Sequence, residues 1–190
     1  MGFGTGGVNV MTIYLDMDGV IADFFSEFAK RNNVEHWKSI KDKEKALVDL
    51  RYTDYFYQID CFEPWNLPNN SQRVVNFVKS KGDWGICSSP LRGDEYNSAY
   101  WKRLWLEKWD FMPEVGNCIF THNKHHYAIN KLTGKPNILV DDKIRNIAAW
   151  NKAGGIGIRF QNDEDDIETY LFPKIEEALE TVGQHNSIYF

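Results

Sequence analysis

Two aspartates one residue apart, followed by a glycine, stand at the end of the first apolar run of the chain. Asp16 and Asp18 follow residues 11–15, and Gly19 comes directly after them. An aspartate carboxylate can attack phosphorus as a nucleophile and form an aspartyl-phosphate. A second acid two residues further on can protonate the leaving oxygen and then activate water, while a glycine permits a tight turn around a phosphate. The pattern indicates phosphoryl transfer, and its alternative is a pair that only caps or turns the chain.

A second acidic pair, Asp141 and Asp142, follows the apolar run at residues 138–140. Four carboxylates gathered at one place repel one another strongly, and a hard divalent cation such as Mg²⁺ relieves that repulsion because it prefers oxygen ligands. Mg²⁺ held by protein carboxylates also commonly binds substrate phosphates. The sequence therefore predicts a Mg²⁺ site that is formed by Asp16, Asp18, Asp141 and Asp142.

Five short apolar runs predict the scaffold that brings these distant residues together. Unalternating runs of this length are typical of strands buried on both faces of a parallel sheet. Helical stripes lie between them, and a last stripe from Ile167 to Leu179 predicts a terminal helix in which Pro173 can introduce a kink. This alternation predicts a doubly wound, mostly parallel, Rossmann-like α/β sheet. The predicted strands are residues 11–15, 84–87, 118–120, 138–140 and 156–160.

Residues 32–68 interrupt the alternation of strands and helices. A charged helical stretch from Lys38 to Arg51 is followed by a group of aromatic residues. We interpret this segment as a small, mainly helical cap inserted after the first strand, over the carboxyl ends of the strands, where open α/β sheets bind ligands. The alternative for its rings is ordinary core packing. The core domain then comprises residues 11–31 and 69–190, and residues 1–10 are expected to be a flexible leader.

The composition favours a cytoplasmic protein of one domain that does not bind extended nucleic acid. Of the 190 residues, 43% are hydrophobic, which allows one domain with a sizeable core. The net charge of -5 disfavours extended nucleic acid as a partner, because polyanions need a basic face. We expect no membrane association, since no apolar run could span a bilayer, and we expect Cys61, Cys87 and Cys118 to be reduced thiols. A homodimer is compatible with these features.

Several motifs resemble known phosphatases. DMDGV at Asp16, CSS at Cys87, a downstream lysine and VDD at Val140 resemble the haloacid dehalogenase-like (HAD) superfamily. The segments DMDGVIADF, ICSSP, KRLWLE, THNK and LVDDK are, in that order, similar to the 5'(3')-deoxyribonucleotidase family, over roughly residues 12–160. The resemblance implies a HAD-like fold and a Mg²⁺-dependent phosphatase for nucleoside 5'-monophosphates. A preference for deoxyribonucleotides is compatible with it.

The resemblance also implies a role for individual residues. It makes Asp16 the nucleophile and Asp18 the general acid/base, whose main-chain carbonyl also reaches the metal. Ser88 stands where the family usually has threonine, and it keeps the hydroxyl group. His122 and Asn123 replace the arginine and aspartate of the family's T-R-D-K motif. The remaining assignments are Ser88, Ser89, Lys102 and Lys124 for phosphate, Phe24 and Phe56 for the substrate's base, and Asp141 and Asp142 for the metal.

Some of these residues have plainer explanations that the sequence leaves open. Ser88 could cap a helix, Lys102 could be a solvent-exposed helix lysine, and Phe24 could pack in the core beside Phe25 and Phe28. Two other functions also stay open. One is a phosphatase for another small phosphoester or for the terminal phosphate of an oligonucleotide, and the other is a nucleotide-binding regulator without catalysis.

Overall fold

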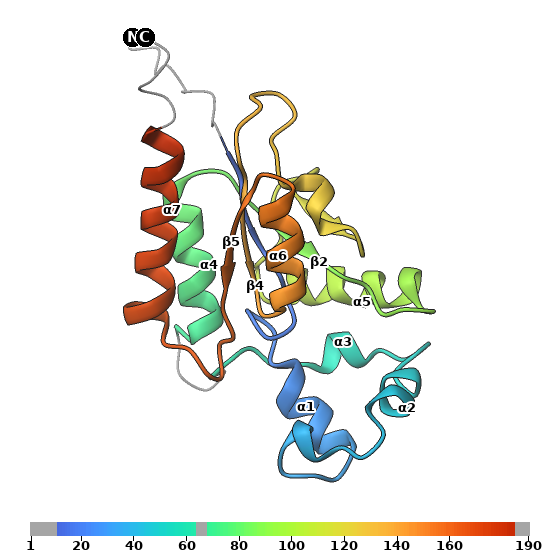
Figure 1. Cartoon of the computed structure of the whole chain (residues 1–190). Coiled ribbons are helices and arrows are strands. Elements are labelled where there is room, and N and C mark those ends of the chain that lie inside the picture. The colour runs from blue at the N-terminus through green and yellow to red at the C-terminus, as the bar shows by residue number, and fades with distance from the viewer. Residues whose placement is uncertain (1–10, 64–67, 185–190) are drawn as a thin grey trace.

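The computed structural model describes residues 11–63 and 68–184, and its centre is a five-stranded sheet (Figure 1). All strand pairs are parallel, and the strand order is β3-β2-β1-β4-β5. The chain therefore moves first to one side of β1 and then to the other, which defines a doubly wound, Rossmann-like α/β fold. The fold class predicted from the sequence is confirmed. The strands are β1 (Ile13–Leu15), β2 (Trp84–Ser88), β3 (Cys118–Phe120), β4 (Ile138–Asp141) and β5 (Ile156–Arg159).

The longer helices correspond to the stripes expected between the strands. The predicted terminal helix begins as a π-helical turn, η3 (Ile167–Leu171), and continues as an α-helix from Phe172, one residue before Pro173. Proline has no N–H donor, so it suits a position where the hydrogen-bond pattern of a helix changes. The longer helices are α4 (Asn70–Lys81), α5 (Glu95–Lys108), α6 (Ile144–Lys152) and α7 (Phe172–Gln184).

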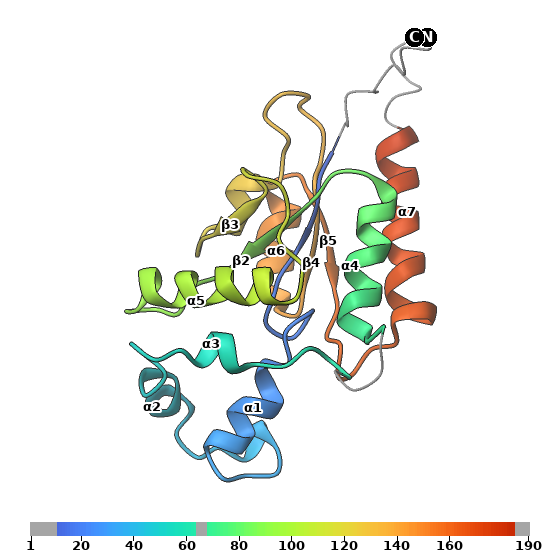
Figure 2. The same ribbon diagram turned by 180° about the vertical axis from the view of Figure 1, so that it is seen from behind.

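Helices cover both faces of the sheet. Ile13 and Leu15 are fully buried in a core that they share with apolar residues of α4, α5 and α7. Tyr14 points to the opposite face, where its ring packs edge-on against Trp150 of α6. Figures 1 and 2 show α4 and α7 together on one side of the sheet and α6 on the other. Burial on both faces explains why the strands are continuous apolar runs rather than alternating ones.

The helices that follow β1 are short and lie beyond the carboxyl ends of the strands (Figures 1 and 2). The first of them begins at Phe24, after the loop that contains Gly19. Residues 64–67 of the predicted cap and residues 1–10, the predicted leader, lie outside the described residues. These elements are α1 (Phe24–Arg31), η1 (Trp37–Ser39), α2 (Lys43–Val48) and α3 (Tyr55–Gln58).

The continuous helix predicted from Lys38 to Arg51 is wrong. The 3₁₀ turn η1 ends at Ser39, and α2 begins only at Lys43 and has six residues. Ile40 is buried between them, and Asp42 caps α2 by accepting a hydrogen bond from the backbone N–H of Lys45. A buried apolar residue and an N-cap interrupt the helix here, so tertiary packing overrides the helix propensity of the charged residues.

Hydrogen bonds join the segment between α2 and α4 to α5 and to the loop before it. The backbone N–H of Tyr52 donates to Asp94 at 2.9 Å, and Asn97 donates to the carbonyl of Thr53 at 3.0 Å. The indole of Trp105 donates to the carbonyl of Ile59 at 2.7 Å. These bonds fix the short helices over one end of the sheet.

Within residues 11–63 and 68–184, every helix is too short or too polar to cross a bilayer. Cys61, Cys87 and Cys118 are free thiols, and the first two are buried.

Candidate active site

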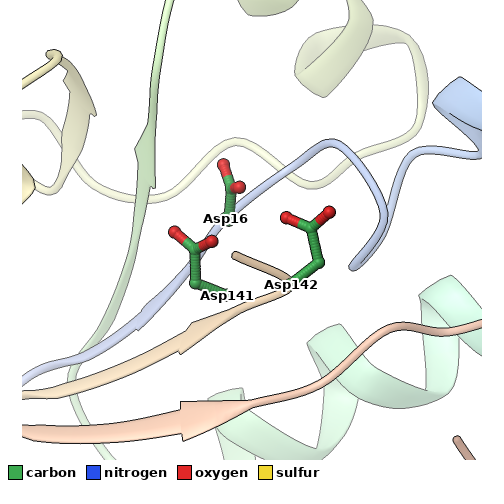
Figure 3. Close-up of side chains that lie close together, drawn as sticks. All are labelled: Asp16, Asp141 and Asp142. Atoms are coloured by element: carbon green, nitrogen blue, oxygen red, sulfur yellow. The ribbon is translucent and has the colours of Figure 1, made fainter. Parts of the chain in front are cut away.

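The two acidic pairs meet because β1 and β4 are neighbouring parallel strands. Asp16 follows β1 directly, Asp141 ends β4 and Asp142 comes next. The backbone N–H of Asp16 donates to the carbonyl of Val140 at 2.9 Å, which extends the pairing beyond the strand. Figure 3 shows the carboxylates of Asp16, Asp141 and Asp142 together, and one oxygen of each lies within 4.8 Å of the others. The carboxylate of Asp18 is not part of this acid cluster.

Lys124 is the cation within the acid cluster. It begins the 3₁₀ helix η2 (Lys124–Tyr127) after β3, and it is almost fully buried. Its Nζ lies 3.0 Å from Oδ1 of Asp16 and 2.5 Å from Oδ2 of Asp141. Burial favours the neutral amine, but the two carboxylates outweigh it and raise the pKa of Lys124 above its ordinary value. The ammonium group therefore pairs with the acid cluster, and a phosphate would have to share it.

The three carboxylates differ in their unused oxygens. Both oxygens of Asp141 accept hydrogen bonds, from the backbone of Lys143 and from the side chains of Lys124 and Asn146. Oδ1 of Asp142 is buried without a partner in the described part of the chain. At Asp16, Oδ1 accepts from the backbone N–H of the next residue at 2.8 Å, and no protein donor among the described residues reaches Oδ2.

The acid cluster fits a divalent cation. Burial, followed by the charges of Asp16 and Asp141, raises the pKa of Asp142 well above its ordinary value. Burial also raises the pKa of Asp141. At Asp16 the effect of burial is outweighed by Lys124, Lys102 and Lys143, which lower the pKa. The excess of buried negative charge, with carboxylate oxygens that have no protein partner, matches the hard oxygen donors that Mg²⁺ requires.

Asp18 is held apart from the acid cluster by Lys102 of α5. Lys102 is fully buried, although the sequence left a solvent-exposed position open. Its Nζ donates to Oδ2 of Asp18 at 2.7 Å, to Oγ of Ser88 at 3.0 Å and to the carbonyl of Ser89 at 3.0 Å. An ammonium has three protons, so these acceptors use all of them. Oδ1 of Asp18 is buried and has no hydrogen-bond partner within the described residues.

Gly19 allows the chain to turn beside the acid cluster. Its backbone φ angle is +80°, a value that residues with a Cβ atom rarely adopt. A Cβ at this position would lie 2.9 Å from Oδ2 of Asp142 and 3.0 Å from the ring of Phe25. Both the backbone and the space at this position therefore require glycine.

Gly19→Ala is expected to lower the free energy of unfolding by about 1–2 kcal/mol, the cost of a left-handed conformation at a residue with a Cβ. For the phosphatase activity that the sequence predicts, we expect kcat/KM to fall about tenfold, because the new methyl group displaces Asp142. Gly134→Ala is the matched control, since Gly134 has φ +71° and nothing within 4 Å. Urea unfolding should show a loss of stability in both variants and the larger loss in Gly19→Ala, where the methyl group also meets Asp142 and Phe25. Only Gly19→Ala should lose activity; equal activities would contradict this role of Gly19.

A pocket of about 680 Å³ lies beside Asp18, between the short helices and the loops after β2 and β4. Ser89 and two sequence-predicted aromatic residues, Phe24 and Phe56, line it. Their rings are stacked on each other with centroids 6.2 Å apart. Phe24 also contacts Phe25 and Phe28, so it contributes both to the pocket wall and to the core. The Nζ of Lys102 lies 4.7 Å from the centroid of the Phe56 ring.

The structure brings most of the sequence-predicted residues together but adds others that the sequence analysis missed. Ser88 lies at the end of β2 next to Lys102, while Lys124 and the acid cluster lie at the ends of the neighbouring strands. The missed residues line the same pocket, and three of them come within four positions after the VDD motif, which is the signal that could have indicated them. The missed residues are Arg51, Arg92, Lys143, Arg145 and Asn146.

Comparison with solved structures finds 16 similar chains, and two of them are described here. A protein from Burkholderia xenovorans LB400 that is described as a haloacid dehalogenase-like hydrolase is 16% identical, with a TM-score of 0.49; the match covers 89% of this chain and 98% of that chain. A hydrolase from Pseudomonas syringae is 14% identical with a TM-score of 0.40, over 95% and 100% of the two chains. No family model and no curated protein matches the chain.

Proposed function

We propose that this protein is a Mg²⁺-dependent, HAD-like phosphatase that hydrolyses nucleoside 5'-monophosphates through an aspartyl-phosphate. The observation that carries the proposal is the position of Asp16. Its carboxylate lies in the acid cluster at the strand ends and has one oxygen that no donor in the described part of the chain reaches. Asp18 follows two residues later at the edge of the pocket, and its Oδ1 likewise has no partner within residues 11–63 and 68–184.

In the first step, Oδ2 of Asp16 attacks phosphorus in line with the ester oxygen. A bond forms between Asp16 and phosphorus, and the bond between phosphorus and the ester oxygen breaks. Because Lys102 occupies Oδ2 of Asp18, the proton for the leaving alcohol comes from Oδ1 of the same carboxyl group. The products of this step are the free nucleoside and the phosphorylated Asp16.

In the second step, water hydrolyses the aspartyl-phosphate. Asp18, now ionised, accepts a proton from the water, and the resulting hydroxide bonds to phosphorus. The bond between Asp16 and phosphorus breaks, so inorganic phosphate leaves and both aspartates return to their starting states. Lys102 and Ser88 lie beside Asp18, where they can balance charge on the transferred phosphoryl group.

Asp16 and Asp142, with the main-chain carbonyl of Asp18, are the groups that would hold Mg²⁺. When bound, the ion neutralises charge on the phosphate and lets it approach the carboxylate of Asp16. Asp141 does not contact the ion in this arrangement, and it stabilises the site by accepting hydrogen bonds from Lys124 and Asn146. This division between the two late aspartates rests on their hydrogen bonds: both oxygens of Asp141 accept from protein donors, whereas the buried Oδ1 of Asp142 has no partner among the described residues.

The rings of Phe24 and Phe56 support a nucleotide as the substrate. Both line the pocket that contains Asp18, so a ring system attached to the phosphoester would contact an aromatic wall. Among the described residues that line the pocket, Phe24 and Phe56 are the only phenylalanines, tyrosines or tryptophans. In this arrangement the phosphate binds at the acid cluster, and the base of the nucleotide packs against the rings of Phe24 and Phe56.

A phosphate-release assay tests the proposed function. The wild-type chain is incubated with ribo- and deoxyribonucleoside 5'-monophosphates and with non-nucleotide phosphomonoesters, each with Mg²⁺ and with EDTA. We expect phosphate release from the nucleotides only when Mg²⁺ is present. We also expect a smaller KM for the nucleotides than for the non-nucleotide phosphomonoesters. Equal rates of phosphate release from sugar phosphates would contradict the proposed preference for nucleotides. Phosphate release that persists in EDTA would contradict the proposed dependence on Mg²⁺.

A further inference from the structure

The pocket beside Asp18 carries more positive charge than the rest of the chain. Its lining contains four basic side chains, Arg51, Arg92, Lys143 and Arg145, against the acidic Asp18 and Glu44. The chain as a whole has a net charge of -5. The charge of Asp18 is already balanced by Lys102, so of the acidic lining residues only Glu44 remains to offset the four basic side chains. A concave surface of this kind attracts anions.

None of the four basic side chains has an acidic partner among residues 11–63 and 68–184. The ion pairs of the described residues involve other lysines and arginines, and the only side-chain hydrogen bond of the four runs from Nε of Arg51 to the carbonyl of Arg92 at 2.9 Å. Like charges around one cavity repel one another, which a bound anion relieves. The cluster therefore points to a ligand rather than to an internal role.

The four residues form two groups on different sides of β1. Arg92 follows β2, whereas Lys143 and Arg145 follow β4, and β2 and β4 flank β1 in the sheet. Lys143 acts on the acid cluster, because its charge lowers the pKa of both Asp16 and Asp142. Arg51 and Arg92 are not among the main charges that act on these groups.

Arg51 and Arg92 come together from two segments that are distant in sequence. Besides the hydrogen bond between them, the guanidinium of Arg51 lies directly over Gly93, where a Cβ would be 2.6 Å from its Cζ. Arg92 comes four positions after Ser88 in the sequence, so the Cα atoms of these two residues lie at most about 14 Å apart. Guanidinium groups bind phosphate through pairs of charge-assisted hydrogen bonds.

We propose that Arg51 and Arg92 bind a second phosphate of the substrate, separate from the phosphate that Asp16 receives. The inference rests on the proposed function for the transferred phosphate and adds a substrate class to it, nucleotides that carry a 5'-phosphomonoester and a further phosphate on the 3' side. A free nucleoside 3',5'-bisphosphate and the 5'-phosphorylated end of a short oligonucleotide both have this chemistry.

Titration calorimetry with the Asp16→Asn variant tests the second phosphate site without turnover. The ligands are thymidine 5'-monophosphate, thymidine 3',5'-bisphosphate and 5'-phosphorylated dithymidylate. We expect the bisphosphate to bind at least about tenfold more tightly than the monophosphate. Adding Arg92→Gln or Arg51→Lys should reduce that ratio to less than about threefold. Arg103→Gln, an exposed arginine of α5 outside the pocket, is the control that should keep it.

The outcomes separate this inference from the proposed function. Equal binding of mono- and bisphosphate, absence of binding by the bisphosphate, or a preference that survives Arg92→Gln overturns the second phosphate site. Phosphate release from the monophosphate by the wild-type chain is measured separately and bears only on the proposed function. If the dinucleotide binds more tightly than the bisphosphate, the second phosphate is that of an oligonucleotide; the reverse order assigns it to a free bisphosphate.

Discussion

Asp16→Asn is expected to lower kcat for nucleoside 5'-monophosphates by about 10⁴-fold or more, because the amide cannot act as the nucleophile that forms the aspartyl-phosphate. The fold should survive this change. Asparagine has nearly the same volume, and Lys124 keeps its ion pair with Asp141. Rates from phosphate release, together with circular dichroism and thermal unfolding, measure both effects.

Asp49→Asn is the matched control for this substitution, since Asp49 is exposed and pairs only with Lys45 in the described structure. It should retain the wild-type rate. A rate in Asp16→Asn within about tenfold of wild type would exclude Asp16 as the nucleophile. Loss of the folded structure in that variant would instead show that the carboxylate is needed for stability.

Asp142→Asn is expected to weaken Mg²⁺ binding by about 100-fold or more, whereas Asp141→Asn should weaken it about tenfold or less. The reason is that, among the described residues, the buried Oδ1 of Asp142 has no hydrogen-bond partner, whereas both oxygens of Asp141 have one. Both variants remove one negative charge, so the comparison isolates the effect of direct contact with the ion. Titration calorimetry with Mg²⁺ alone gives the two dissociation constants.

Stability provides the second comparison between these two variants. Asp141→Asn should lower the free energy of unfolding by about 1–3 kcal/mol, since Asp141 is fully buried and accepts charge-assisted and backbone hydrogen bonds. Asp142→Asn should leave stability the same or raise it, because it removes the charge of a carboxylate whose buried Oδ1 has no hydrogen-bond partner among the described residues. If Asp141→Asn weakened Mg²⁺ binding more than Asp142→Asn, the assignment of the two aspartates would be reversed.

The sheet could be predicted because its strands are buried on both faces. Continuous apolar runs such as those before Asp16 and Asp141 have few other stable positions in a protein of this size. The polar residues after each run could be assigned to one edge, since parallel strands have their carboxyl ends on the same side. Local pattern and tertiary structure agree there, so the expectation and the observed fold agree as well.

The short helices after β1 could not be predicted in detail. Lys38 to Arg51 has the composition of one long helix, yet the chain buries Ile40 and begins a new helix after Asp42. That interruption depends on which residue packs against the rest of the molecule, and intrinsic propensity carries no information about it. The same limit applies to Phe24, which the sequence offered either to the pocket or to the core and which contacts both.

The pairing of the site's charges depends on contacts over long distances in the sequence. The partners Lys102 and Asp18 are 84 residues apart, and Arg51 lies 41 residues before Arg92. Lys124 was expected to meet phosphate, and the structure places it between Asp16 and Asp141. Strand order decides such contacts, and residue spacing alone does not determine strand order.

The central claim is that a phosphoryl group passes through Asp16, and it can be measured directly. Wild-type protein is mixed with a nucleoside 5'-monophosphate and Mg²⁺, quenched in acid within milliseconds, digested and analysed by mass spectrometry. The account predicts a phosphoryl group on the peptide that contains Asp16, and none on that peptide in Asp16→Asn. Turnover with no phosphorylated Asp16 peptide at any quench time, or with the phosphoryl group on another residue, would contradict it.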